Sequence, residues 1–368
     1  MKRSILFILH LPPPIHGAAM VGQYIKNGSV VNETFDTDFI NLAISDQLGQ
    51  IGKYQIGKFY RLMKLMSEFL SMLFKKKHDL YYITLTAKGS GFYKDFAIVL
   101  ILKMFRKKII YHFHNKGILT LQDNIYNNFL YRFLFKDTQS ILLSEKLYYD
   151  LEKYVNIEDV YFCPNGLPKS DLTVATKAEV PARVRILFLS NMMIEKGILV
   201  LLEACKILKE KGVEFICDFV GPWTDITEKD FNTIVTNSNL TGYVFAHGQQ
   251  YNEKKEVFFD STDIFVLPTY YNNECFPLVI LEAMKHGLPV ISTFEGAISE
   301  MIVNEKTGFV GPQHDSKFLA EKLESLIKMP EMRLKMGEAA RKRFDDFYTI
   351  DTFEQNIVEI LKESIDRV

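Results

Sequence analysis

The feature that most constrains the fold is an alternation of short apolar runs with longer amphipathic stretches. Several runs are apolar at successive positions, which is typical of strands buried on both faces of a parallel sheet. Amphipathic stretches of ten or more residues between them are typical of crossover helices. In the first half the runs are Ser4–Leu11, Asp38–Ala43, Asp79–Thr86, Lys108–Asn115, Gln139–Ser144 and Val160–Pro164. In the second half they are Val184–Ser190, Phe215–Gly221, Tyr243–His247, Ile264–Pro268, Pro289–Thr293 and Thr307–Val310.

A segment of linker composition at residues 169–182 separates the two sets of runs. The chain has 368 residues, and a single core stops growing at about 250–300 residues. The pattern therefore predicts an α/β fold with two doubly wound, Rossmann-like domains, at residues 1–172 and 173–350. An amphipathic segment at 351–368 follows, and its pattern does not show which domain it packs on. Ligands bind beyond the carboxyl ends of parallel strands, so the site is expected in a cleft between facing domains.

Composition limits the location and the partners. Residues 1–170 hold 22 Lys and Arg against 14 Asp and Glu, a balance of +8, whereas the remainder holds 22 against 31, a balance of −9. The basic half is expected to face something anionic. Four cysteines lie scattered, as is typical of free thiols in a reducing compartment. The N-terminal apolar run reads as a strand rather than a signal peptide, so we predict a cytoplasmic protein.

Two glutamates separated by seven residues span the predicted start of a helix. Glu274 precedes Pro277, a residue suited to the first helical position, and Glu282 lies about 7 Å further along the helix axis. The free N–H groups of Phe276 and Leu278 would form an anion site at the helix end. An anion site flanked by two carboxylates that accept hydrogen bonds from hydroxyls indicates a sugar nucleotide.

Other predicted strand ends carry residues that suit a phosphorylated ligand. Gly17 lies between the first strand and a helix, where it lets the backbone approach an anion. Lys196, beside a glycine in a strand-to-helix turn, can pair with a diphosphate. The G-x-G-x-x-G pattern is missing, so a dinucleotide cofactor is not expected. Residues expected where a base or ribose approaches the backbone are Gly221, His247 and Gly248.

Two histidines, His112 and His114, lie at the end of a predicted strand, on the same side of it. A metal site is one interpretation, but the sequence places no third ligand. A structural histidine is the commoner outcome for either residue. At the carboxyl end of a strand, contact of one of them with substrate is the interpretation that we favour.

Taken together, these motifs resemble the large retaining glycosyltransferase family usually called family 4, which has the GT-B architecture of two Rossmann-like domains around a central cleft. The resemblance covers essentially the whole chain. It is most specific at Glu195-Lys-Gly197, at Glu274–Glu282, at the following Ala283–Ile291 and at Pro164-Asn-Gly166. It implies transfer of a sugar from a nucleoside diphosphate sugar, such as a UDP- or GDP-sugar, to an acceptor hydroxyl. Retention of anomeric configuration is implied, with neither metal nor cofactor, and so is a last helix that returns to the first domain.

The resemblance also implies roles for individual residues. Glu274, His114 and Lys196 would be catalytic: the first two near the donor sugar, and Lys196 on the diphosphate. Glu282 would hold the ribose hydroxyls, and Gly17 would face the phosphates. Three positions depart from the family pattern. Asn191 stands where Arg is frequent in the diphosphate site, His16 replaces the first of two glycines, and Cys275 stands where glycine is frequent.

The acceptor would be a sugar or a lipid-linked oligosaccharide bound by the first domain, in synthesis of a bacterial surface polysaccharide or glycolipid. The segment Lys58–Lys77 combines an apolar side with cations. This pattern is typical of a helix on an anionic membrane surface, but a crossover helix that covers the sheet needs the same apolar side, and we slightly favour the crossover helix. We expect no nucleic-acid partner. Two other functions remain open: a sugar-nucleotide epimerase of the same fold, and a non-catalytic sugar-nucleotide sensor.

Overall fold

The computed structural model describes residues 2–13, 16–43, 56–169, 183–250 and 253–367, with side chains omitted for 56–59. The chain divides into two compact units. Unit 1 consists of residues 1–166 and 350–368, and unit 2 of residues 167–349. The domain boundary expected at 172/173 lies outside the described residues. Within those ranges, none of the helices combines the length and hydropathy of a membrane-spanning segment.

Unit 1 is built on a parallel six-stranded sheet with the order β2-β1-β3-β4-β5-β6. The first and third strands are buried at every position, which explains their continuous apolar sequence. The strands are β1 (Ser4–Leu9), β2 (Asp36–Asn41), β3 (Leu80–Leu85), β4 (Ile109–Phe113), β5 (Gln139–Leu142) and β6 (Val160–Phe162).

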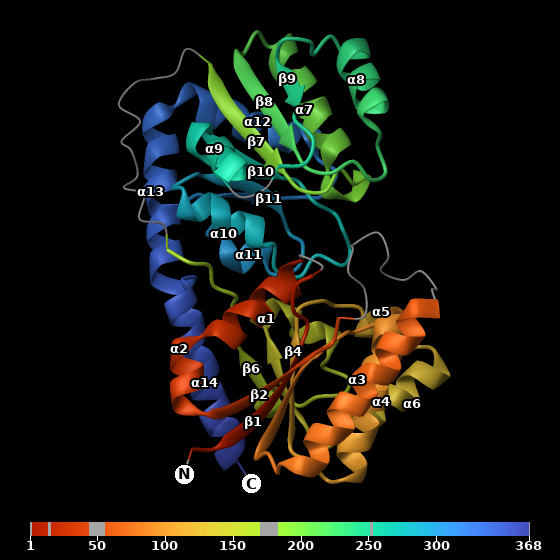
Figure 1. Cartoon of the computed structure of the whole chain (residues 1–368). Helices are drawn as coiled ribbons and strands as arrows, with labels where there is room; N and C mark the ends of the chain where they lie inside the picture. Colours follow the sequence, from red (N-terminus) through yellow and green to blue (C-terminus); the bar gives the residue numbers. More distant parts are fainter. Residues whose placement is uncertain (1, 14–15, 44–55, 170–182, 251–252, 368) are drawn as a thin grey trace. The chain divides into compact units, whose positions relative to one another are not determined.

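Helices cover the sheet of unit 1 on both faces (Figure 1). The longest, α3 (Ile56–Lys75), buries Leu65, Phe69 and Leu73, which are spaced i, i+4, i+8 along one stripe. It therefore covers the sheet as a crossover helix. The other helices are α1 (Gly17–Asn27), α2 (Ser29–Thr34), α4 (Gly89–Met104), α5 (Ile118–Leu121), α6 (Ile125–Phe135) and α14 (Ile350–Asp366).

The last helix, α14, belongs to unit 1. Its side chains Phe353, Ile357 and Leu361 are buried in the same core cluster as Phe7 of β1. Each apolar side chain buried in this way contributes about 1.5–3 kcal/mol. The carboxylate of Glu354 also accepts a hydrogen bond from the Val31 N–H in α2, at 3.0 Å. The C-terminal segment is thus an integral part of the N-terminal unit.

Unit 2 is a second parallel sheet with the order β12-β11-β10-β7-β8-β9. Its strands are β7 (Val184–Leu189), β8 (Phe215–Val220), β9 (Val244–Ala246), β10 (Ile264–Leu267), β11 (Val290–Thr293) and β12 (Gly308–Gly311). Its helices are α7 (Ile198–Glu210), α8 (Glu228–Asn237), α9 (Glu253–Ser261), α10 (Leu278–Lys285), α11 (Ile298–Met301), α12 (Ser316–Lys328) and α13 (Pro330–Phe347). The prediction of two doubly wound units is confirmed, and each of the twelve apolar runs overlaps a strand.

The strand orders locate the point in each sheet where the winding reverses. In unit 1 this point lies between β1 and β3, and in unit 2 between β7 and β10. Loops after such strands separate and leave a crevice at the carboxyl edge of the sheet, where open α/β sheets bind ligands. The segments after β7 and β10 contain Lys196 and Glu274 respectively. The topology therefore places these two residues in segments that flank the expected ligand crevice of unit 2.

Candidate functional site

The turn after β7 presents Lys196 at the carboxyl edge of the sheet of unit 2. A short 3₁₀ helix (Ile194–Lys196) ends there, and Gly197 adopts a left-handed conformation with φ +89°. A Cβ at Gly197 would lie 2.1 Å from the carbonyl oxygen of Pro268, so only glycine fits. The carbonyl of Glu195 accepts a hydrogen bond from the Tyr270 N–H at 2.8 Å. These contacts fasten the turn after β7 to the segment after β10.

Lys196 and Glu274 form an ion pair across the switch point. The Lys196 Nζ lies 2.5 Å from Oε2 of Glu274. Both side chains are largely buried, with 13% and 11% of their surface exposed. The same ammonium lies 4.7 Å from the centre of the Tyr271 ring, a cation–π contact. A buried charge needs a partner because desolvation is costly, and here each group supplies the partner of the other. The structure thus joins two of the residues that the sequence singles out for the diphosphate and the donor sugar.

The helix N-terminus predicted as an anion site begins one residue later than expected. α10 starts at Leu278, and Pro277 is its N-cap rather than its first residue. No side chain caps this end of the helix, whose Ile280 N–H bonds back to the Pro277 carbonyl at 3.0 Å. Phe276 is buried and packs against Tyr348, with ring centres 6.0 Å apart. The amide of Leu278 therefore stays at a helix end that no side chain caps, while the Phe276 side chain serves packing.

The second glutamate of the motif lies within α10 and already has a cationic partner. Oε1 of Glu282 lies 2.5 Å from the Nζ of Lys255 on α9. Both side chains are mostly buried, with about a fifth to a quarter of their surface exposed. A ribose that binds Glu282 would share this carboxylate with Lys255, an arrangement that the sequence does not reveal.

A third set of polar contacts, centred on Asp218, connects side chains of β7, β8 and the end of β9. Asp218, 2% exposed, accepts hydrogen bonds from Arg185 at 2.8 Å and from Nε2 of His247 at 2.7 Å. The bond fixes His247 at the end of β9, where its ring packs on Phe258. Gly221 is needed for backbone packing, since a Cβ there would lie 1.8 Å from the Ser190 carbonyl oxygen. Space around Gly248 is open, so a ligand can approach its backbone.

The carboxyl edge of unit 1 gathers histidines at the ends of β1 and β4. The rings of His112 and His114 are 4.2 Å apart, and those of His10 and His16 are 5.9 Å apart. Burial lowers the pKa of all four histidines, and that of His114 falls to about 3, with His16 as a further cause. The nearby ammonium of Lys94 further lowers the pKa of His10. These imidazoles are therefore neutral at pH 7.

His112 is hydrogen-bonded to a buried tyrosine. Its Nδ1 and the hydroxyl of Tyr82 form a hydrogen bond whose direction depends on the tautomer of the imidazole. Burial raises the pKa of Tyr82 well above its usual value, so its hydroxyl stays protonated. Nε2 of His112 and Nδ1 of His114 are both buried without a hydrogen-bond partner among the described residues.

Gly17 is the first residue of α1, and His16 caps this helix. Nδ1 of His16 accepts a hydrogen bond from the Ala19 N–H at 3.3 Å. The imidazole thus occupies one of the free N–H donors at this helix end. Gly17 and His114 belong to unit 1, whereas the two glutamates and Lys196 belong to unit 2.

The structure adds residues that sequence analysis missed. Asp218, Lys255 and His10 hold or neighbour predicted site residues, yet nothing in their local sequence distinguishes them. Gly296 was detectable as a glycine after a strand: it has φ +53°, and a Cβ there would lie 2.5 Å from the Glu274 carbonyl oxygen. Asn191 is exposed in the turn after β7. Its contribution to a diphosphate site stays a prediction.

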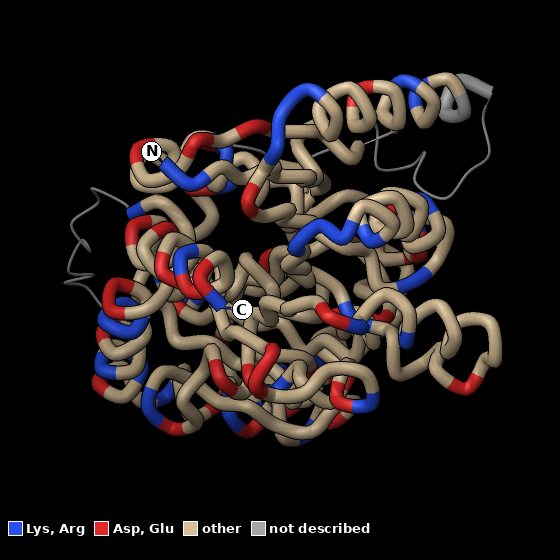
Figure 2. Tube along the Cα trace, turned by 90° about the horizontal axis from the view of Figure 1, so that it is seen from below, with Lys and Arg blue, Asp and Glu red and all other residues tan. Residues whose placement is uncertain are grey.

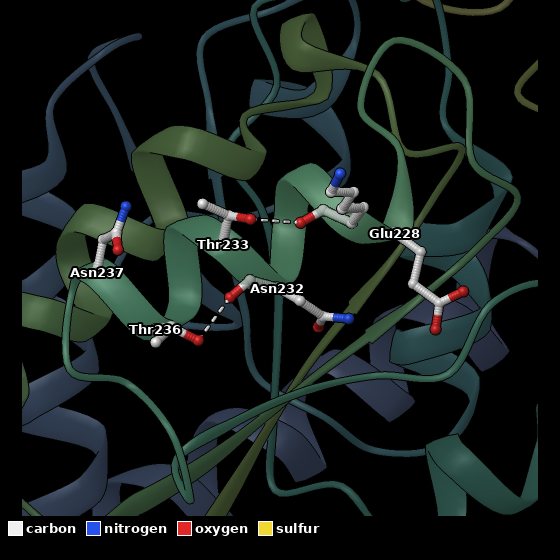
Figure 3. Close-up of a pocket in the computed structure, with 6 residues that line it drawn as sticks. Glu228, Asn232, Thr233, Thr236 and Asn237 are labelled. Carbon is white, nitrogen blue, oxygen red and sulfur yellow. Dashed lines mark hydrogen bonds between the residues drawn. The ribbon is translucent and has the colours of Figure 1, made fainter.

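Two other features carry no such chemistry. Among the described residues, no group of three or more His, Cys, Asp or Glu side chains could hold a metal ion. A depression of about 670 Å³ lies on α8, lined by residues of that helix alone (Figure 3). Two of its side chains, Thr233 and Thr236, bond back to carbonyls of the same helix. The depression is a polar helix face, and none of the predicted site residues lines it.

Comparison with known proteins is consistent with this geometry. Residues 175–343 match the family model described as Glycosyl transferases group 1. The chain has the GT-B fold. It resembles sucrose-phosphate synthase from Thermosynechococcus elongatus (TM-score 0.73, 16% identity, 98% of this chain and 99% of that one). It also resembles Anabaena HepE in complex with UDP and glucose (TM-score 0.71, 17% identity, 98% and 100%). At these identities the likeness shows the fold alone.

Several of the similar sequences are named for polysaccharide synthesis. The amylovoran biosynthesis glycosyltransferase AmsK of Erwinia amylovora is 32% identical over 160 residues, which are 42% of this chain and 37% of AmsK. The capsular polysaccharide biosynthesis glycosyltransferase CapM of Staphylococcus aureus is 28% identical over 165 residues, 44% of this chain and 41% of CapM. The chain spans less than half the length of the curated relatives that it matches. The chain thus shares the GT-B fold, and its residues 175–343 are similar to the group 1 glycosyl transferases.

Proposed function

We propose that this chain is a retaining glycosyltransferase that moves a sugar from a nucleoside diphosphate sugar to an acceptor hydroxyl. The ion pair of Lys196 and Glu274 at the switch point of unit 2 carries the proposal. It lies in the part of the chain that matches the glycosyl transferases group 1 model. The relatives favour synthesis of a bacterial surface polysaccharide or glycolipid, with a sugar or lipid-linked oligosaccharide as acceptor.

Departure of the nucleoside diphosphate concentrates negative charge on the leaving oxygen. Two groups supply positive charge: Lys196, which pairs with Glu274 in the segment before α10, and the uncapped N-terminus of α10. Preorganised charge of this kind in a buried site stabilises a transition state strongly. These groups of the protein can balance the diphosphate, so the mechanism that we propose is independent of metal.

Glu274 orients the donor sugar in this mechanism. Its carboxylate is shared with an ammonium, which lowers its nucleophilicity and favours hydrogen bonding to sugar hydroxyls. The acceptor oxygen bonds to the anomeric carbon on the face from which the diphosphate leaves. The bond from that carbon to the phosphate oxygen breaks, and the acceptor proton passes to the departing phosphate. Configuration is retained without a covalent enzyme intermediate.

Slow hydrolysis of a panel of UDP-, GDP- and other nucleoside diphosphate sugars tests the proposal, followed by nuclear magnetic resonance assignment of the product anomer. Lys196→Met is expected to lower kcat/KM by about 10²–10³. Lys229→Met, on the outer face of α8, is the matched control and should leave kcat/KM unchanged.

Other outcomes select other functions. Conversion of the donor to a different free sugar without acceptor would identify an epimerase. Binding of a nucleotide sugar with neither hydrolysis nor transfer would identify a sensor. Inversion of the anomeric centre, or a trapped covalent glycosyl-Glu274 adduct, would contradict the mechanism.

A further inference from the structure

We propose that the outer helices of unit 1 dock on an anionic membrane surface. The docking face consists of exposed apolar side chains on three helices: Phe74 of α3, Tyr93, Leu100 and Met104 of α4, and Ile125 and Phe129 of α6. Met104 is 73% exposed, Phe129 69% and Phe74 67%. Large apolar side chains exposed to this degree on neighbouring elements indicate an interaction site rather than scattered surface residues.

Aromatic contacts connect the three helices that carry these six residues. On α4 they recur at Tyr93, Leu100 and Met104, and on α6 at Ile125 and Phe129, so each helix presents a stripe along its axis. Phe96 of α4 packs on Phe133 of α6, with ring centres 5.8 Å apart. At the other side of α4, Phe74 contacts Phe105 at 5.4 Å. The three helices lie side by side in Figure 1, and the six side chains on them are exposed.

The segment that contains these helices is basic, and two basic runs at the ends of α3 and α4 form what we call the basic rim. Residues 60–136 hold fourteen Lys and Arg against four Asp and Glu, a balance of +10. One of the four carboxylates, Asp95, is fully buried and paired with Lys94. Basic runs follow α3 at Lys75-Lys76-Lys77 and α4 at Arg106-Lys107-Lys108, and they precede the adjacent strands β3 and β4. Figure 2 views the molecule toward the edge where these runs lie, with Lys and Arg in blue.

Charge decides between the possible occupants. Because residues 60–136 carry a balance of +10, two copies that meet through this region would repel each other, so self-association through it is disfavoured. Exposed Phe, Met, Leu and Ile side chains need an apolar phase, which a soluble polyanion does not offer. A bilayer with anionic headgroups satisfies both needs, because acyl chains take the apolar stripes and headgroups pair with the basic rim.

The proposed orientation has a consequence that depends on the proposed function. α4 and α6 begin near the carboxyl edge of the sheet, which carries the unpartnered histidine nitrogens. With these helices lying in the plane of the membrane, that edge would stay at the headgroup level. A lipid-borne acceptor hydroxyl could then reach it without leaving the bilayer.

Vesicle co-sedimentation of the full chain tests the docking, with phosphatidylcholine vesicles compared with vesicles containing phosphatidylglycerol. We expect binding at low salt to the anionic vesicles alone, weakened by salt. Met104→Glu/Phe129→Glu, which removes apolar contacts, should reduce the bound fraction at least about tenfold. Lys75→Glu/Arg106→Glu, which reverses the rim charge, should do the same. Thr233→Glu/Asn237→Glu and Lys229→Glu/Lys335→Glu place matched charges on unit 2 and should bind as the wild type does.

Three results would overturn the proposal: no binding of the wild type to anionic vesicles, equal binding by the docking-face and control variants, or a stable dimer that Met104→Glu/Phe129→Glu dissociates. Donor hydrolysis without vesicles separates this proposal from the proposed function. It should be unchanged in the docking-face variants, which lie outside the predicted catalytic residues. Hydrolysis without vesicle binding would refute docking alone, and vesicle binding without hydrolysis would refute the enzymatic function alone.

Discussion

The carboxyl edges of the two sheets are built from similar elements but have opposite electrostatic character. In unit 2 the edge holds paired charges: Lys196 with Glu274, and Lys255 with Glu282. In unit 1 it holds four histidines with lowered pKa values, two of which leave buried nitrogens without partners in the described part of the chain. Paired ions suit a charged diphosphate, and neutral imidazoles suit hydroxyl groups.

The largest effect is expected for the Lys196–Glu274 pair at the carboxyl edge of the sheet of unit 2. Lys196→Met should weaken binding of a nucleoside diphosphate by about 2 kcal/mol, roughly thirtyfold, because a charge-assisted hydrogen bond is lost. Glu274→Gln should strengthen it, because the ammonium no longer has to leave a carboxylate. Isothermal titration calorimetry of both variants measures the two effects.

The decisive result is a change in nucleotide affinity of opposite sign in the two variants. If both residues had merely structural roles, both substitutions would weaken binding. A Glu274→Gln variant that binds the nucleotide more weakly than the wild type would show that the ion pair positions Lys196 rather than competing with the ligand.

The stability of unit 1 should depend on pH, because the histidines at the carboxyl edge of its sheet are neutral when folded. Below about pH 6.5 the unfolded chain binds protons that buried His112 and His114 do not bind in the folded protein. The free energy of unfolding should therefore be highest above that pH and fall as the pH falls, by up to about 1.4 kcal/mol per pH unit for each proton. His112→Gln keeps an acceptor for Tyr82 but cannot titrate, so this dependence should become shallower.

Hydrogen exchange of β4 amides between pH 5 and 7 reports on unit 1, and amides of β7 serve as an internal control. Identical pH slopes for wild type and His112→Gln at β4 would show that His112 does not stay neutral in the folded unit.

The smallest expected effect concerns the second glutamate. Glu282→Gln should raise the KM for the donor about fivefold, or about 1 kcal/mol, because an amide accepts fewer hydrogen bonds from a ribose. The kcat should change little, since the ribose is remote from the reacting carbon. A kcat that falls together with kcat/KM would place Glu282 in the transition state instead. Lys255→Met is the companion variant, because it removes the partner of Glu282 and leaves its carboxylate intact.

Local sequence predicted the elements well and their partners poorly. The strands were recognisable because β-strands buried on both faces must be apolar throughout, as in β1 and β3. The Glu274–Glu282 segment was recognisable because proline and a glutamate pair at a helix start form a local pattern. Lys255 and Asp218 carry no such signal, since the groups that they bind come from other elements. The helix start was misplaced by one residue, since proline suits both the N-cap and the first turn.

By itself, the sequence determined the two parallel α/β units, the glutamate motif, the cationic turn at Lys196 and the basic excess of the first half. Only the tertiary structure decided the strand order and hence the switch points, the return of α14 to unit 1 and the pairing of Lys196 with Glu274. It also gathered the four histidines of β1, α1 and β4 and aligned the apolar stripes of α4 and α6. The physical reason is that periodicity records which face of an element is buried. Partners and charge environments depend on contacts between elements far apart in the chain, which periodicity does not encode.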